Sequence, residues 1–358
     1  MKALRFEVRK DDLATARISE TDLPSPGDGE LLVEIDRFAL TANNITYGVV
    51  GERIGYWKFF PADAGWGVIP VWGFAKVIAS NHPEIEVGER LYGYFPMGKQ
   101  CVMQAGKIRP DRLVDSSAHR ASLPLVYNSY ARTAGEAHYE PAMDDERMLL
   151  FPLYATSFCL YDFLDDNGYF GAEQVIVVSA SSKTAIGLAY AFDMHEGPVA
   201  CVGLTSSGNL ERVRTLGLYD SVATYDALGS IDASLPTVIV DMSGNGRVLS
   251  DLHAMLGDNM RYTSNVGVTH YADNQMGPHF RRERSAMFFA PGHIEKRNRD
   301  WGPGEFQQRA YRFWREASIR SRDWLRIETT SGLRELPGVY AQLLAGRVAP
   351  DVGIVIEV

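Results

Sequence analysis

An alternation of apolar runs and short polar segments in the middle of the chain gives the clearest prediction of local structure. Val175–Val178 is an uninterrupted β-branched run, which is typical of a parallel strand buried on both faces. Small polar residues occupy 179–184, an apolar stretch at helical spacing follows, and Gly197-Pro198 breaks the chain before a second apolar run at 199–204. The pattern therefore predicts a strand, turn, helix and strand, which is a βαβ unit of about 30 residues.

The polar turn between the first strand and the helix is a candidate phosphate site, because such a turn directs backbone N–H groups and a helix N-terminus at one point. The usual glycine-rich fingerprint is reduced, since only Gly187 stands where a helix glycine would let strand and helix pack closely. A P-loop is excluded, because it needs glycines and none lies between Gly171 and Gly187. An α/β unit that binds nothing remains the alternative. Four polar residues fill the turn: Ser181, Ser182, Lys183 and Thr184.

The same alternation continues downstream and differs from the pattern upstream. Strands that alternate with helices at this spacing predict a doubly wound parallel sheet of the Rossmann type in an α/β protein. Residues 1–122 instead show short strand-like segments separated by turns, which predicts a mostly-β domain. The downstream elements are expected as helices over 209–216 and 247–256 and as strands over 199–204, 221–225, 237–242 and 262–268.

These patterns divide the chain into three parts. Residues 1–122 are expected to form a β-rich domain, and 123–270 the dinucleotide-binding domain. Residues 271–358 are expected to complete the β-rich domain and the sheet. Within the second part, 123–134 and 151–164 have spacings that are compatible with helices.

Composition and charge exclude several classes of protein. A net charge of −9 argues against a general nucleic-acid-binding surface, which is usually basic. No run of about 18 apolar residues exists for a transmembrane helix, and the first ten residues lack the apolar stretch of a secretory signal. The three cysteines provide neither a disulfide framework nor a Cys-x-x-Cys metal site. A protein of the cytoplasm is therefore expected, without a membrane or nucleic-acid partner.

Four short phrases precede or join the βαβ unit in a fixed order, at 23–35, 41–47, 87–93 and 152–157. Together with that unit they resemble the medium-chain dehydrogenase/reductase superfamily, specifically its zinc-free quinone-oxidoreductase-like branch, over nearly the whole chain. The resemblance implies a Rossmann-type sheet beside a GroES-like mostly-β domain. It also implies nicotinamide-dependent redox chemistry and a homodimer formed through an edge strand of the sheet.

The sequence also departs from that superfamily. Members with catalytic zinc carry a Gly-His-Glu phrase where this chain has Val71–Ala75, and the structural cysteine cluster is missing too. Because zinc needs three or four N, S or O ligands, no metal is expected. The segment 125–151 lies where the superfamily usually has few residues.

The choice of cofactor follows from the end of the second predicted strand. An NAD enzyme places Asp or Glu about 20 residues past the turn, to bind the ribose 2′-hydroxyl. This chain has Thr205 and Ser206 there, with Arg212 close behind. Hydroxyls and a nearby cation accept a 2′-phosphate that a carboxylate would repel. We therefore expect NADP(H), with Lys183, Ser206 and Arg212 as phosphate contacts and Thr205 beside them. Ser206 has an alternative role as a helix N-cap. The two roles are compatible, because a cap and an anion site use the same helix end.

The resemblance places Asn44 and Tyr47 beside the nicotinamide, with Tyr47 as a proton donor or oxyanion partner. A phenol suits that role, because it is neutral at pH 7 and donates one hydrogen bond. Packing within the β domain is the alternative for Tyr47. Tyr56 and Trp57 are expected to form an aromatic wall for a flat, apolar substrate, although such clusters also serve as core.

Further candidates come from the rest of the chain. The resemblance implies that Thr156 contacts the nicotinamide at a helix start, with a helix cap as the alternative. It also implies that the backbone of Gly267 and Val268 lines the nicotinamide pocket. His270, just beyond them, is an acid–base candidate or a hydrogen-bonded structural residue. Tyr127 and Asn128, in the 125–151 segment, are candidates for the substrate pocket.

The predicted function is that of a zinc-independent, NADPH-dependent reductase. It would transfer hydride to a small, flat, apolar molecule, either a quinone or an activated alkene. Two alternatives remain open. One is carbonyl or alcohol redox chemistry, and the other is a non-catalytic NADP(H)-binding protein of the same fold.

Overall fold

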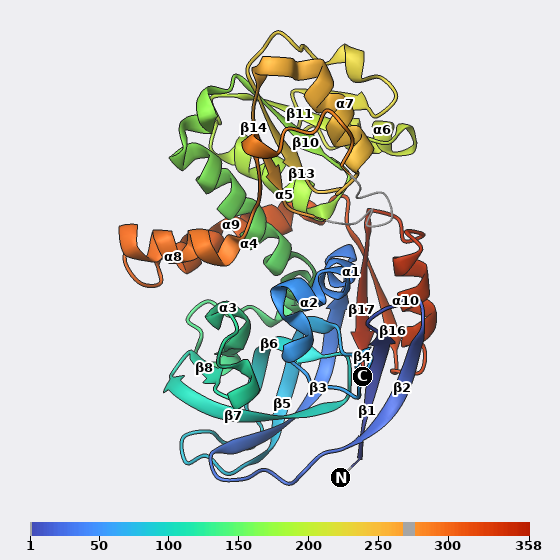
Figure 1. Cartoon of the computed structure of the whole chain (residues 1–358). Coiled ribbons are helices and arrows are strands. Elements are labelled where there is room, and N and C mark those ends of the chain that lie inside the picture. Colours follow the sequence, from blue (N-terminus) through green and yellow to red (C-terminus); the bar gives the residue numbers. More distant parts are fainter. Residues whose placement is uncertain (1, 268–275) are drawn as a thin grey trace. The chain divides into compact units, whose positions relative to one another are not determined.

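A computed structural model of the chain describes residues 2–267 and 276–358. The chain divides into two units (Figure 1): unit 1 comprises Met1–Leu149 and Leu325–Val358, and unit 2 comprises Leu150–Trp324. These boundaries differ from the expected 1–122, 123–270 and 271–358. Residues 129–132 pair within the sheet of unit 1, and residues 285–287 pair within the sheet of unit 2.

Unit 1 is built around one long strand, β3 (Glu30–Leu40). Its first half pairs antiparallel with β7, its last four residues pair with β17, and β5 lies along most of its length. The pairings β5–β6, β6–β9, β9–β8 and β8–β7 then lead back to β3, so these strands close into a barrel. The mostly-β, GroES-like domain is confirmed. The other strands of this unit are β1 (Lys2–Arg9), β2 (Ala16–Asp22), β4 (Trp66–Gly67), β5 (Pro70–Ser80), β6 (Arg90–Pro96), β7 (Gln100–Arg109), β8 (Arg112–Asp115), β9 (Ser129–Arg132), β16 (Arg326–Ser331) and β17 (Val352–Glu357).

The helix expected over 123–134 is wrong. Only α3 (Leu125–Asn128) is α-helical there; β9 follows at once, and a 3-10 turn begins at Thr133. The reason is tertiary, because the Tyr130 side chain is fully buried against Gly93, where an added Cβ would lie 2.2 Å from the Tyr130 ring. The other α-helices of unit 1 are α1 (Ala42–Val49), α2 (Gly51–Ile54) and α10 (Leu336–Leu344), and short 3-10 turns include Tyr56–Lys58 and Ala118–Arg120.

Unit 2 contains the parallel sheet that the alternating pattern predicts. Among the described residues the strand order is β12-β11-β10-β13-β14-β15, and every neighbouring pair is parallel. This is the 3-2-1-4-5-6 order of the Rossmann fold, so the predicted fold class is confirmed. The strands are β10 (Gln174–Val178), β11 (Ala200–Thr205), β12 (Ser221–Thr224), β13 (Thr237–Asp241), β14 (Met260–Asn265) and β15 (Ser285–Met287).

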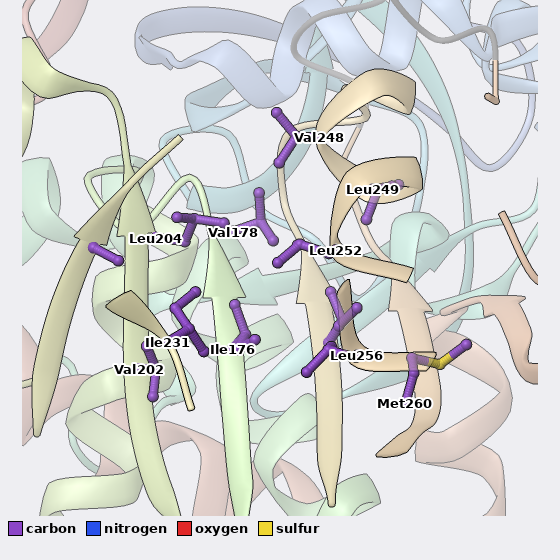
Figure 2. Close-up of a cluster of buried hydrophobic side chains, with 12 residues drawn as sticks. Ile176, Val178, Val202, Leu204, Ile231, Val248, Leu249, Leu252, Leu256 and Met260 are labelled. Atoms are coloured by element: carbon purple, nitrogen blue, oxygen red, sulfur yellow. The ribbon is translucent and has the colours of Figure 1, made fainter. Parts of the chain in front are cut away.

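The core of unit 2 lies on both faces of this sheet. Ile176 and Val178 of β10 pack with Leu204 of β11 and with the apolar stripe of α7 (Gly246–Leu256) in one buried cluster (Figure 2). Side chains alternate between the faces of a strand, and Val175 and Val177 are equally inaccessible to solvent. The sheet is therefore covered on its other face as well, which is why β10 needs an uninterrupted apolar run.

Two helices of unit 2 differ from expectation. Helix α4 spans Asp144–Asp166 with Pro152 inside it, so it begins before the expected residue 151. Helix α8 (Ala290–Asp300) was not expected, and its charged stripe packs through Arg297 and His293 against Asp162 of α4. None of the described helices has the length and apolarity that a membrane span requires. The remaining helices are α5 (Lys183–Met194), α6 (Leu210–Thr215) and α9 (Glu305–Ser321).

Candidate functional site

The carboxyl edge of the parallel sheet is a candidate site within unit 2. Strand β10 lies between β11 and β13, so the strand order reverses at β10. Ligands of open α/β sheets bind at such a topological switch point. The turn at 179–182 follows β10, and the turn at 241–244 follows β13. The structure therefore brings the serine-rich turn to the place where a dinucleotide binds in this fold.

The turn after β10 is tight and ends in a capped helix. Ser179 has a left-handed backbone with φ of 64°, and the backbone N–H of Ser182 donates to the Ser179 carbonyl at 2.8 Å. The Ser182 hydroxyl accepts the N–H of Ala185 at 3.3 Å, which makes Ser182 the N-cap of α5. Ser181 is buried, and Lys183 and Thr184 open the first turn of the helix. That first turn carries the positive end of the helix dipole, which favours an anion.

Gly187 does not allow close packing of helix and strand, which its position predicted. A Cβ added there would meet Ser157 Oγ and the Tyr154 ring, both at 2.6 Å. The close approach is therefore between helices α5 and α4, and not between α5 and the strand. The Ser157 hydroxyl also donates to the Thr184 carbonyl at 2.7 Å, which ties the start of α5 to α4.

The end of β11 carries the residues expected to select the cofactor. Thr205 is buried. Ser206 is half-buried, and its hydroxyl oxygen accepts a hydrogen bond from Asn209 Nδ2 at 3.2 Å. The neighbouring Ser207 hydroxyl donates to Asp226 at 3.0 Å. Asp226, which follows β12, is a carboxylate that the sequence analysis missed, because only the strand pairing brings it next to β11. Arg212 is exposed on α6.

The turn after β13 is ordered by one buried carboxylate. Asp241 accepts the N–H and hydroxyl of Ser243 at 2.8 and 2.7 Å, and the N–H of Gly244 at 2.9 Å. Gly267, which follows β14, approaches this turn so closely that an added Cβ would lie 2.3 Å from the Met242 carbonyl oxygen. Val268 and His270 lie outside the described residues, so their predicted roles stay predictions.

Thr156 is not at a helix start. It lies inside α4, and its hydroxyl donates to the Pro152 carbonyl one turn earlier at 2.9 Å. The cap interpretation is therefore wrong, because α4 begins twelve residues before Thr156, at Asp144. Its hydroxyl instead serves the backbone of its own helix.

Unit 1 has a candidate site of its own at helix α1. Asn44 is buried and structural: its Oδ1 accepts the Thr41 N–H at 2.8 Å, and its Nδ2 donates to the Pro70 carbonyl at 3.0 Å. Asn43, one residue earlier, donates through Nδ2 to the Tyr47 hydroxyl at 2.7 Å. Asn44 was expected at the site and Asn43 was not, although the i, i+4 spacing of Asn43 and Tyr47 on a helix is a signal for such a contact.

The Tyr47 hydroxyl is held in a cluster of aromatic rings, which we call the tyrosine cluster. Trp72 Nε1 also donates to this hydroxyl, at 3.4 Å, and the Tyr47 ring lies 4.7 Å from that of Tyr56. The hydroxyls of Tyr56 and Tyr127 share a 3.0 Å hydrogen bond. The cluster consists of Tyr47, Tyr56, Phe59, Trp72, Tyr94 and Tyr127.

Burial sets the proton affinity in this cluster. It raises the pKa of Tyr47 well above its ordinary value, and Tyr127 raises it further, while hydrogen bonds from Trp72 and Asn43 act in the opposite direction. Burial likewise raises the pKa of Tyr56. These phenols therefore stay protonated across the physiological range, and Tyr47 is a neutral hydrogen-bond donor. Of its members, Trp72 and Tyr127 are half-buried and so form the accessible part of the cluster.

Two predicted pocket residues lie elsewhere. Trp57 packs between Gly51 and Gly67, where added Cβ atoms would lie 2.3 and 2.4 Å from its ring, so it does not share a wall with Tyr56. Asn128 is buried and donates to the Arg120 carbonyl at 3.2 Å, which holds its own loop. Both residues are structural because a side chain that fills a tight gap or satisfies backbone is unavailable to a ligand.

The described part of the chain contains no group of three or more His, Cys, Asp or Glu side chains arranged to hold a metal ion. The three cysteines, Cys101, Cys159 and Cys201, are buried free thiols. Burial raises the pKa of the Cys101 thiol to about 12. A buried thiol of this kind behaves as a small apolar side chain.

Comparison with solved structures finds the same fold over the full chain. CurA from Vibrio vulnificus, solved with NADPH, is 14% identical with a TM-score of 0.67, covering 99% of both chains. A mutant form of an enoyl thioester reductase from Candida tropicalis is 10% identical, with a TM-score of 0.60. A quinone oxidoreductase from Coxiella burnetii is 12% identical, with a TM-score of 0.56. Both comparisons cover 100% of each chain. At these identities the likeness establishes the fold alone, and it confirms the fold of the medium-chain dehydrogenases/reductases.

Comparison with other protein sequences identifies the family of the chain. No curated protein matches the chain significantly. One family profile matches residues 38–349, which is most of the chain. The chain therefore belongs to the family described as "Protein of unknown function (DUF2855)".

Proposed function

We propose that this protein is a zinc-independent, NADP(H)-dependent oxidoreductase that reduces a quinone or an activated alkene. The hydroxyl of Tyr47 is the observation that carries the proposal. Its oxygen accepts hydrogen bonds from Asn43 and Trp72, and the Tyr94 side chain also acts on it. In the proposed complex its O–H donates to the substrate. A neutral, oriented donor of this kind stabilises negative charge on a substrate oxygen and can supply a proton to it.

The carboxyl edge of the sheet in unit 2 fits the cofactor. NADPH supplies hydride when bound. The turn at Ser181 and Ser182 and the first turn of α5, with Lys183 and Thr184, would hold the pyrophosphate. Thr205 and Ser206, with Arg212 behind them, would receive the adenosine phosphate, and the backbone at Gly267 would border the nicotinamide. The binding of NADPH by CurA, which shares the fold, supports this assignment.

The accessible members of the tyrosine cluster support a flat, apolar substrate. Trp72 and Tyr127 are half-buried, and their rings lie 6.2 Å apart. The hydroxyl of Tyr127 is hydrogen-bonded to that of Tyr56, which restrains the Tyr127 ring. Ring faces of this kind favour offset stacking of planar molecules. Enones and quinones are planar and carry the carbonyl oxygen that a phenol donor requires.

Two measurements test this proposal. Fluorescence titration should show tighter binding of NADPH than of NADH, since the phosphate contacts act on NADPH alone. Stopped-flow oxidation of the bound NADPH by a panel of quinones, enones, aldehydes and ketones should then show turnover with the first two classes. Turnover of the aldehydes or ketones alone would favour carbonyl chemistry. Tight NADPH binding without any turnover would favour the non-catalytic binding protein.

A homodimer through the sheet edge is part of the proposal. Strand β15 pairs with β14 alone among the described strands, so one side of it is open. Met287 and Phe289 beside that edge are 39% and 44% exposed. An open, apolar edge strand is a template for pairing with a second copy. A dimer by light scattering that Met287→Glu converts into a monomer would support it, and a monomeric wild-type protein would refute it.

A further inference from the structure

The hydroxyl of Tyr94 is buried without a hydrogen bond, and the function proposed above does not use it. Tyr94 lies on β6 and is 0% exposed, and no described residue is in hydrogen-bonding geometry with its hydroxyl. The other phenols of the tyrosine cluster are bonded, since Tyr56 and Tyr127 bond to each other and Tyr47 accepts from two donors. An unsatisfied hydroxyl in a protein interior costs free energy, so it requires an explanation.

Tyr94 faces Tyr47 from the sheet of unit 1. It lies directly opposite Trp72 in the antiparallel pairing of β5 with β6, and opposite residues carry their side chains on the same face of a sheet. The Tyr94 ring packs edge-on against the Tyr47 ring with centroids 5.6 Å apart, and it lies 5.2 Å from the Trp72 ring. Because Trp72 already donates to the Tyr47 hydroxyl, the strand pairing brings a second donor from the sheet towards the same oxygen.

Two donors fill the acceptor capacity of the neutral Tyr47 hydroxyl. Its oxygen has two lone pairs, and Asn43 and Trp72 donate to it at 2.7 and 3.4 Å. A phenolate oxygen has a third lone pair, because the electron pair of the broken O–H bond stays on it. A third donor therefore gains a place on this oxygen only when Tyr47 has lost its proton. Tyr94 is a neighbouring side chain whose hydroxyl is unpaired and can take that place.

We propose that Tyr94 is a positioning residue of the reaction, and that its hydroxyl donates a hydrogen bond to Tyr47 when Tyr47 becomes a phenolate. The proposal rests on the reductase function proposed above. In that reaction the substrate oxygen becomes negative once the substrate has accepted hydride. The O–H bond of Tyr47 then breaks, the proton goes to the substrate oxygen, and the electron pair stays on the Tyr47 oxygen until solvent returns a proton.

The Tyr94 hydroxyl offsets part of the cost of a buried phenolate. Burial raises the pKa of Tyr47, and the Tyr94 side chain acts in the opposite direction, as a group that donates to the ionised form does. Hydrogen bonds to charged groups are about twice as strong as those between neutral groups. An interaction that forms only as charge develops lowers the barrier without tightening the binding of the substrate. The Tyr94 ring is held in place beforehand, since it also packs edge-on against Phe59 at 5.1 Å, so little rearrangement is needed.

Tyr94→Phe distinguishes this role from a structural one. The variant keeps the ring and removes an unpaired hydroxyl, so the free energy of unfolding should stay the same or rise. The kcat for an accepted quinone or enone should fall about tenfold to a hundredfold, with KM unchanged. Urea unfolding and steady-state kinetics on the full chain measure the two effects. A loss of stability or a failure to fold would show that the hydroxyl is bonded in the resting protein, and either result, or an unchanged kcat, would refute the proposal.

Tyr340→Phe is the matched control for that variant. Tyr340 is 1% exposed in the same unit, and its hydroxyl donates to the Leu13 carbonyl at 3.0 Å. Removing a hydroxyl that is bonded in the resting protein should lower the free energy of unfolding and leave kcat unchanged. The two variants should therefore change stability and kcat in opposite ways, and the same pattern in both would contradict a special role of Tyr94.

A titration at position 47 tests the hydrogen bond without turnover. A trifluorinated tyrosine, whose phenol is more acidic than that of tyrosine, replaces Tyr47, and fluorine NMR follows its ionisation in the full chain. In Tyr94→Phe the pKa of this phenol should rise by about one unit or more, because the phenolate loses a donor. Tyr127→Phe is the control within the cluster, since Tyr127 raises the pKa of Tyr47, and its removal should not raise the pKa. The same titration with and without the Tyr94 hydroxyl, or ionisation in neither protein up to mildly alkaline pH, would refute the proposal.

These tests separate the failure of this proposal from the failure of the proposed function. If no quinone or enone were reduced, or if Tyr47→Phe left turnover unchanged, the reductase function and the part of Tyr94 in it would both be wrong. If Tyr47→Phe impaired turnover while Tyr94→Phe changed neither kcat nor the titration at position 47, the role of Tyr94 alone would be wrong.

Discussion

Asn43 and Tyr47 lie one turn apart on α1, and Asn43 Nδ2 donates a 2.7 Å hydrogen bond to the Tyr47 hydroxyl. The adjacent Asn44 points its amide at backbone instead, at Thr41 and Pro70. Two neighbouring residues of the same type therefore have different tasks. One orients the candidate acid, and the other fixes the helix that carries it.

Removing the Tyr47 hydroxyl should impair turnover. Tyr47→Phe is expected to lower kcat for an accepted quinone or enone about a hundredfold, which is the usual contribution of a positioned acid. NADPH affinity should not change. Steady-state kinetics and fluorescence titration check both points, and an unchanged kcat would remove Tyr47 from the chemistry.

Asn43→Ala and Asn44→Ala should separate activity from stability. Asn43→Ala leaves the Tyr47 hydroxyl with one donor, so kcat should fall while the free energy of unfolding drops by only about 1 kcal/mol. Asn44→Ala removes a buried group that satisfies Thr41 and Pro70, so it should cost about 1–3 kcal/mol. Urea unfolding beside kinetics measures the two effects. If both variants changed kcat and stability alike, Asn43 would have no orienting role of its own.

Charge at the end of β11 should set the cofactor preference. Ser206→Asp is expected to weaken NADPH binding by about tenfold or more, because the new carboxylate repels the 2′-phosphate. Asp226→Asn removes the carboxylate that Ser207 contacts and should strengthen NADPH binding. NADH affinity serves as the internal control. If Ser206→Asp left NADPH binding unaltered, the adenosine phosphate would not lie at this strand end.

His253 should make unit 2 sensitive to acid. The imidazole is buried: Nδ1 accepts the Arg281 N–H at 2.9 Å, and Nε2 lies 2.9 Å from the Thr263 hydroxyl. Burial, and secondarily the Arg281 charge, lowers the pKa of His253 to about 4, although Glu283 acts in the opposite direction. The unfolded chain binds this proton near pH 6.5. Stability is therefore lost as pH falls from about 6.5 towards 4, by at most about 3 kcal/mol.

The control for that effect is His253→Gln, which keeps a polar side chain without the titration. Its free energy of unfolding should fall less than that of the wild type between these two pH values. Urea unfolding at several pH values measures the difference. Parallel pH profiles would show that His253 is not responsible.

Gly267 should not tolerate a side chain. In Gly267→Ala the new Cβ would lie 2.3 Å from the Met242 carbonyl oxygen, so the strand end must shift at a cost of about 1–3 kcal/mol, and NADPH binding should weaken with it. Gly338→Ala is the contrasting control, since nothing lies within 4 Å of an added Cβ in that helix. It should gain about 0.5–1 kcal/mol. Thermal unfolding distinguishes the two, and equal effects would contradict the predicted close approach.

Local sequence patterns were sufficient to predict the βαβ unit and the parallel sheet. The run Val175–Val178 is buried on both faces, and α5 begins at Lys183, within the polar turn where the pattern predicts the start of a helix. These features are local, because a strand buried on both faces and a helix start are written in consecutive residues.

Other features depend on contacts between residues that are distant in the sequence. The expected helix over 123–134 became β9 because Tyr130 needs the space beside Gly93. Asp226 reaches Ser207 only through the pairing of β11 with β12. Tyr56 joins the tyrosine cluster, whereas Trp57 fills a gap between two glycines. These different roles of two consecutive residues depend on contacts with residues far apart in the chain. Such contacts produce no periodic pattern in the sequence, so they cannot be predicted from neighbouring residues.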